Sequence, residues 1–109
     1  MKAINEWVKE IHQTAVDKGW WEDPVRRPLE IHALIHSEIA EATEAYRENI
    51  KEIYIDIDGK PEGEAIELAD TVIRIMDYFG YMGWNLEKAI ELKTEFNKTR
   101  SKRHGGKKA

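Results

Sequence analysis

Two pairs of acidic residues could carry chemistry, because the members of each pair are three positions apart. The pairs are Glu38 with Glu41 and Glu67 with Asp70. Residues at this spacing share one face of a helix, and both segments have the apolar period of helices. A carboxylate taken out of water without a partner is costly, so four of them facing one interior predict a bound cation. Hard oxygen ligands suit Mg²⁺ or Mn²⁺, and Mg²⁺ commonly shares its shell with phosphates, so the pattern favours phosphate chemistry.

Four helices are predicted to position these carboxylates, and the predicted fold class is all-α. The apolar period places the helices at residues 2–18, 28–49, 61–83 and 86–101. In the second helix, the acidic pair borders an apolar stripe made of Ile31, Ile35, Ile39, Ala42 and Tyr46. In the third, Asp70 falls within the apolar face, Glu67 lies at its border, and Asp77 follows on the same side. If these two helices pack antiparallel, the acidic pairs meet near the middle of a bundle.

Glycine and asparagine residues mark the expected helix ends. Gly19 is placed to end the first helix in a left-handed cap, Gly80 and Gly83 are expected to close the third, and Asn85 is the expected N-cap of the fourth. Residues 50–61 alternate isoleucine with polar residues, but no second alternating run follows. We therefore expect an irregular or short extended crossover there, and no stable hairpin.

The fourth helix carries groups that complement phosphate. Lys93, Asn97 and Arg100 continue the row of its apolar residues, so this face becomes cationic toward the C-terminus. Lysine acts as a point charge on phosphate and arginine as a planar fork, whereas asparagine can donate to phosphate or base. The alternative is an ordinary helix end, where cations are favoured by the helix dipole.

Other motifs are weaker. Trp20 and Trp21 could plug the core or, from their loop position, stack on a nucleotide base. His32 and His36 have the spacing of zinc ligands, but the glutamate of the H-E-x-x-H motif is missing. A calcium loop aligned on Gly59 lacks acids at its first and last positions, so that interpretation is rejected.

Composition indicates one globular domain in 109 residues, with 41% hydrophobic and 35% charged residues. Residues 98–109 carry six basic and no acidic side chains, and because the whole chain has a net charge of -4, the first 97 residues carry -10. We therefore divide the chain into a domain at 1–101 and a basic tail at 102–109. No cysteine, signal peptide or long apolar run is present, so we expect a cytoplasmic protein with no membrane contact.

Taken together, the motifs resemble those of the MazG-like nucleoside triphosphate pyrophosphohydrolases, in the all-α NTP pyrophosphatase superfamily. The resemblance spans nearly the whole chain and combines E-x-x-E at 38–41, E-x-x-D at 67–70, the Lys/Asn/Arg block at 93–100 and H-G-G-K at 104–107. The family's fuller pattern is E-E-x-x-E, and Ser37 stands where its first acid would be. This departure leaves the number of metal ions open.

The resemblance implies a four-helix bundle completed by formation of a homodimer or homotetramer. It also implies that an NTP or dNTP is hydrolysed to the monophosphate and pyrophosphate with Mg²⁺, or Mn²⁺ in its place. Metal ligation would fall to Glu38, Glu41, Glu67 and Asp70, and Glu38 or Glu41 would accept the proton of the attacking water. Nucleotide contacts would come from Lys93, Asn97, Arg100, Trp20 and Trp21.

Two other classes of function remain open from the sequence. A non-catalytic helical interaction module would keep the apolar stripes but would have no use for acids beside them. Nucleic-acid binding would depend on the basic tail, and the acidic body argues against it.

Overall fold

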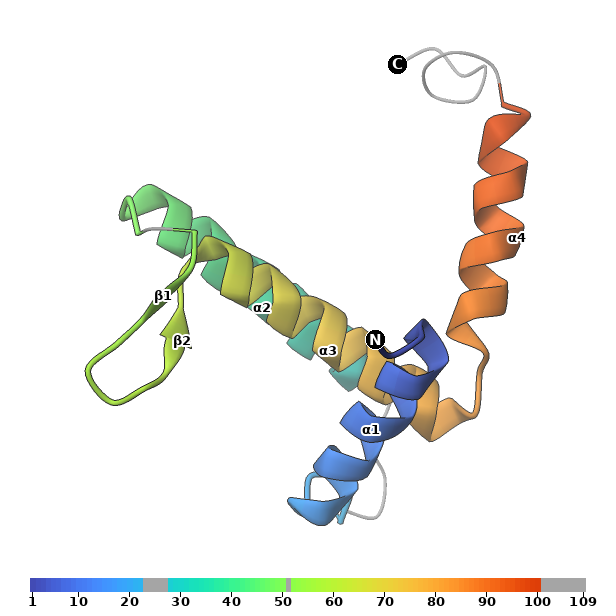
Figure 1. The fold of residues 1–109 in the computed structure, drawn as a ribbon, viewed down its shortest axis with the longest axis horizontal. Helices are drawn as coiled ribbons and strands as arrows, with labels where there is room; N and C mark the ends of the chain where they lie inside the picture. The colour runs from blue at the N-terminus through green and yellow to red at the C-terminus, as the bar shows by residue number, and fades with distance from the viewer. Residues whose placement is uncertain (23–27, 51, 101–109) are drawn as a thin grey trace.

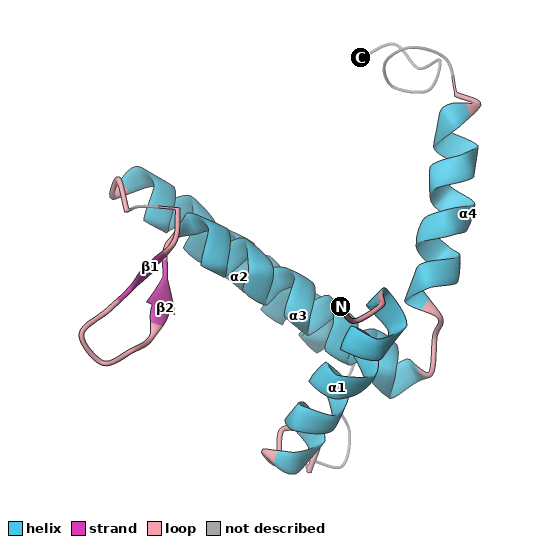
Figure 2. Ribbon diagram, viewed as in Figure 1, coloured by secondary structure: helices cyan, strands magenta, loops and turns pink. Residues whose placement is uncertain are grey.

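The computed structural model of the chain describes residues 1–22, 28–50 and 52–100. These residues form four α-helices and one two-stranded antiparallel sheet, in the order α1, α2, β1, β2, α3, α4. Figures 1 and 2 show α2 and α3 side by side along most of their lengths, with α1 across one end and the two strands at the other. The all-α prediction is confirmed. The basic tail, the predicted end of the last helix at Ser101 and part of the loop after Trp21 lie outside the described residues.

Helix α1 spans Ile4–Asp17 and ends as its sequence predicts. Gly19 has a φ of +78°, and its amide donates to the carbonyl of Val16, while the amide of Trp20 donates to the carbonyl of Ala15. These two bonds satisfy carbonyls that the helix end would otherwise leave free. After this turn, the ring of Trp21 contacts the rings of His12 and Tyr81.

Helices α2 (Pro28–Arg47) and α3 (Glu64–Met82) form the antiparallel pair that positions the acids. Their contact buries Ile31, Ala42 and Ala45 of α2. Two residues of the predicted stripe, however, face outward: Ile39 is 44% exposed and Tyr46 is 69% exposed. The apolar surface of α2 is thus wider than α3 alone can cover.

The connection between α2 and α3 corrects one prediction, because it is a small hairpin. Strand β1 (Tyr54–Ile55) pairs with β2 (Pro61–Glu62). The turn is held by polar groups: Asp56 Oδ1 accepts from the amides of Asp58 and Lys60, and Gly59 has a φ of +82°. An alternating apolar second strand was expected as the mark of a hairpin, but the Asp56 side chain closes the turn without one.

Only one of the two glycines expected to close α3 does so. Gly83 lies in the left-handed region at the end of the helix, with a φ of +70°. Gly80 lies inside the helix, where a Cβ would come 2.5 Å from the Cβ of His12. It therefore serves close packing of α1 against α3 and does not end the helix.

Helix α4 (Leu86–Lys98) extends away from the other three helices (Figure 1) and has no buried residue. Its start is fixed as predicted, because Asn85 Oδ1 accepts from the Lys88 amide. Asn5 of α1 also bonds to Asn85 and to Glu87. The chain has a radius of gyration of 16.6 Å, whereas a compact domain of this length has about 13 Å. A fourth helix is present, but within one chain it does not pack as the fourth member of a bundle.

Among the described residues, no helix combines the length and apolar character needed to span a membrane.

Candidate metal and nucleotide site

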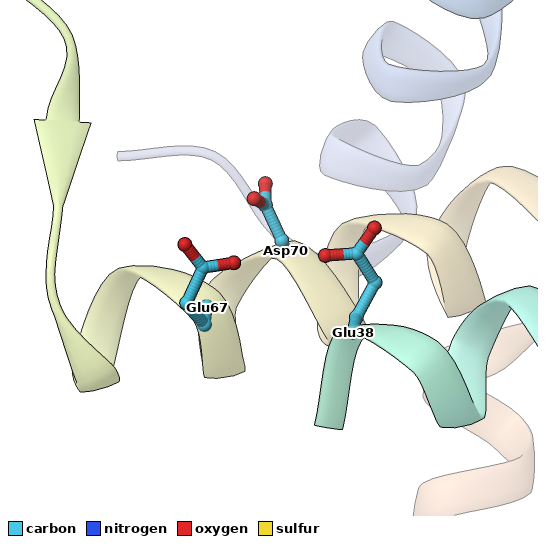
Figure 3. A group of neighbouring side chains, drawn as sticks. All are labelled: Glu38, Glu67 and Asp70. Atoms are coloured by element: carbon cyan, nitrogen blue, oxygen red, sulfur yellow. The ribbon is translucent and has the colours of Figure 1, made fainter. Parts of the chain in front are cut away.

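Three of the four predicted carboxylates converge at the contact between α2 and α3. One oxygen from each of Glu38, Glu67 and Asp70 lies within 4.8 Å of the others. Figure 3 shows Glu38 rising from α2 and pointing toward the two side chains from α3. We call this group the acidic cluster. The i,i+3 spacing on α3 places two of its members on one face, and the antiparallel packing brings the third from the neighbouring helix.

The fourth carboxylate, Glu41, borders the cluster through Glu67. Burial raises the pKa of Glu67, and a hydrogen bond with Glu41 and the negative charges of Glu41, Asp70 and Glu38 raise it further. The pKa of Asp70 is also raised, first by burial and then by the charge of Glu38, while Arg74 and Lys60 oppose this shift. In both residues burial is the largest cause of the raised pKa, and the charges of neighbouring carboxylates add to it.

Arg74 is a member of the site that the sequence analysis did not identify. Its Nε lies 2.7 Å from Oε1 of Glu38, whose residue is only 9% exposed. The signal was available, since Arg74 follows Asp70 by one helical turn and is the cation on an otherwise acidic and apolar face. The Arg74 guanidinium therefore provides one positive charge beside the three carboxylates of the acidic cluster.

A groove of about 480 Å³ begins at the cluster and runs between α1 and α3. Its lining includes Glu38, Asp70 and Arg74 at the polar part and Ile11, Ala15 and Ile73 on the apolar walls, with Glu10, Thr14, Trp20 and Asp77 completing it. Trp20, at 55% exposure, offers an aromatic surface to this groove. The volume and the mixture of apolar walls with a few polar groups are typical of small-molecule sites.

Trp21 has a different position from Trp20. Its Nε1 donates to Asp77 Oδ1 at 2.9 Å, and its ring stacks on Tyr81. His12 Nδ1 lies 2.8 Å from the same Asp77 oxygen. Trp21 is thus held by α1 and α3, whereas Trp20 faces the groove.

Two of the predicted phosphate-binding residues, Lys93 and Asn97, lie on α4, which extends away from α2 and α3 (Figure 1), and Arg100 follows two residues after the end of α4. Lys93, Asn97 and Arg100 are all exposed. Lys93 Nζ lies 5.0 Å and Arg100 Cζ 5.8 Å from the centroid of the Phe96 ring. The structure of one chain therefore groups these cations around Phe96 and does not bring them to the carboxylates.

The two histidines considered as zinc ligands are exposed on α2. His32 packs edge-on against Tyr78, with ring centroids 5.9 Å apart. Neither belongs to the acidic cluster.

Comparison with protein-family models, with curated proteins and with solved structures finds no match.

Proposed function

We propose that the protein is a Mg²⁺-dependent nucleoside triphosphate pyrophosphohydrolase of the MazG-like type, which converts an NTP or dNTP to the monophosphate and pyrophosphate. The observation that carries this proposal is the acidic cluster itself, three carboxylates from adjacent helices within 4.8 Å of one another, two of which, Glu38 and Asp70, line a groove. The reaction is proposed from the sequence resemblance, and the convergence of the carboxylates supports it.

The donor set fits a hard divalent cation. Carboxylate oxygens are the ligands that Mg²⁺ and Mn²⁺ prefer. Burial, followed by the charges of neighbouring carboxylates, raises the pKa of Glu67 and of Asp70, and a bound cation would favour the ionised form of both groups. Glu38, Glu67 and Asp70 would hold the metal, and Glu41 could join them from the next turn of α2. When bound, Mg²⁺ neutralises charge on phosphate oxygens and makes a water more acidic.

The groove suits a nucleotide whose phosphates lie at the cluster and whose base lies along the apolar walls. Trp20 is the residue proposed to stack on the base, because its ring is exposed and lines the groove. Trp21 would contribute indirectly, by holding the loop that carries Trp20, since its own ring already packs on Tyr81. Glu38 or Glu41 would accept the proton of the attacking water.

A second copy of the chain would complete the site. In one chain, Lys93 and Arg100 lie apart from the carboxylates, and α4 leaves Ile90, Leu92 and Phe96 exposed. A second, mostly apolar groove lies between α2 and α3, lined by Ile39, Ala42, Thr43, Tyr46, Glu64 and Leu68. We propose a homodimer, alone or as part of a tetramer, in which apolar helix faces of two copies cover one another and cations of α4 reach the partner's acidic cluster.

The test is a panel of ribo- and deoxynucleoside triphosphates, including modified bases, incubated with Mg²⁺ and assayed for pyrophosphate. Reaction in ¹⁸O water then shows which phosphorus is attacked. We expect Glu41→Gln and Asp70→Asn to abolish turnover while the helical circular dichroism is retained. Glu44→Gln, an exposed acid on the same helix, is the matched control. Near-normal turnover in both site variants would refute the assignment.

A further inference from the structure

Arg74 occupies an unusual place in the acidic cluster. It comes from α3, one turn beyond Asp70, and reaches across to Glu38 of α2, where its Nε and the carboxylate Oε1 are 2.7 Å apart. The carboxylate is nearly buried, whereas the Arg74 side chain is 40% exposed and lines the groove together with Asp70 and Asp77. The guanidinium thus has access both to the cluster and to whatever enters the groove.

The charges around Glu38 explain why this contact forms. Glu38 and Asp70 repel each other, and Arg74 opposes that repulsion at Asp70. Lys60 also acts on Asp70 from the hairpin, but its Nζ pairs with Glu62 at 3.1 Å. A nearly buried, ionised carboxylate is unfavourable without a partner, so a cation beside Glu38 stabilises its ionised form. In the structure, Arg74 is that cation.

We propose that Arg74 is an exchangeable counter-ion, which pairs with Glu38 when no metal is bound and is displaced toward the groove when a divalent cation binds. This inference depends on the proposed function, because it assigns a second role within the same site. A metal ion at the cluster would compete with the guanidinium for Glu38 and repel it. The released fork would then face the groove, where the phosphate oxygens of the proposed substrate would accept its hydrogen bonds.

If Arg74 is an exchangeable counter-ion, its removal has opposite effects on the stability of the metal-free protein and on the affinity for the metal. Removal of the guanidinium should weaken the metal-free fold, since Glu38 loses its partner, but it should also remove a competitor of the metal. If the ion pair only stabilised the fold, its removal would destabilise the metal-free and the metal-bound protein equally. A residue that only binds substrate would leave metal affinity unchanged.

The experiment measures Mn²⁺ binding by electron paramagnetic resonance, without nucleotide, together with melting temperatures in EDTA and in Mn²⁺. The variants are Arg74→Met, which keeps the stem and removes the charge, and Arg74→Lys, which keeps a charge and loses the fork. Arg47→Met, an exposed arginine in the last turn of α2, is the matched control. For Arg74→Met we expect Mn²⁺ binding to tighten by a factor of at least about five, the melting temperature in EDTA to fall, and the difference from wild type to shrink in Mn²⁺. The lysine variant should lie between the two, and the control should match the wild type.

The outcomes separate this inference from the proposed function. If the wild type binds Mn²⁺ but Arg74→Met binds it equally or more weakly, the exchange is overturned and the metal site stands. If neither protein binds Mn²⁺, the metal site and the exchange both fail. If Arg74→Met does not fold, tighter Mn²⁺ binding by Arg74→Lys supports the exchange, and unchanged or weaker binding overturns it.

Discussion

Trp21 stacks on Tyr81 with ring centroids 4.0 Å apart and ring planes only 6° from parallel. The contact fastens the loop after α1 to the C-terminal half of α3, and the hydrogen bond to Asp77 reinforces it. The adjacent Trp20 is directed to the groove instead. Two consecutive residues of the same type therefore have different tasks, one in holding the loop and one in lining the proposed site.

Substitution of the two tryptophans should separate these tasks. We expect Trp21→Ala to lower the free energy of unfolding by on the order of 2–3 kcal/mol, through the lost stacking on Tyr81 and the lost hydrogen bond to Asp77. Trp20→Ala should change it by less than about 1 kcal/mol, because the side chain is more than half exposed. Trp20→Ala should instead raise the KM for the nucleotide. Urea denaturation and steady-state kinetics measure the two effects, and equal destabilisation by both variants would contradict this division.

Gly80 should not tolerate a methyl group, although it lies inside a helix. Glycine to alanine in a helix interior ordinarily gains about 1 kcal/mol. Here the added Cβ would lie 2.5 Å from the Cβ of His12, so α1 and α3 must move apart. We expect Gly80→Ala to destabilise the protein by on the order of 1–3 kcal/mol in urea denaturation. Ala89→Gly on exposed α4 calibrates the intrinsic helix preference, and a Gly80→Ala protein as stable as the wild type would disprove the close contact.

The raised pKa values of Glu67 and Asp70 predict how the stability of the metal-free protein depends on pH. The folded state holds these protons more tightly than the unfolded chain does. The stabilisation of the fold by the protonated Glu67 and Asp70 is therefore fully present below their ordinary pKa values of 4.5 and 3.8. It is lost as the pH rises through the raised pKa values of the folded state. We expect the unfolding free energy of the wild type, relative to a Glu67→Gln/Asp70→Asn double variant, to fall from pH 4 to pH 7. Denaturation in EDTA measures it, and a constant difference would speak against the shifts.

Mixing of inactive variants tests whether two copies share one site. Asp70→Asn removes a carboxylate, and Lys93→Ala/Arg100→Ala removes cations of α4. If α4 serves the partner's cluster, a mixed dimer contains one site with both defects and one intact site. We expect an equimolar mixture, after exchange of subunits, to recover roughly a quarter of wild-type pyrophosphate release, since half the dimers are mixed. No recovery beyond the two separate variants would place both sets of residues in one chain.

Local patterns in the sequence were sufficient to predict the four helices and most of the residues at which they begin and end. The apolar period identified four helices, and the expected roles of Gly19, Gly83 and Asn85 are confirmed, because caps depend on one or two nearby residues. The i,i+3 spacing also placed Glu67 and Asp70 on one face of α3, which needs only the geometry of a helix.

Contacts between distant residues were decided by the tertiary structure alone. Arg74 of α3 contacts Glu38 of α2, and Gly80 of α3 packs against His12 of α1. The antiparallel packing of α2 and α3 selects which carboxylates converge, and the direction of α4 separates Lys93 and Arg100 from them. Sequence periodicity specifies the face of a helix, but the partner of that face depends on how helices pack in space, where small differences in side-chain fit choose between arrangements.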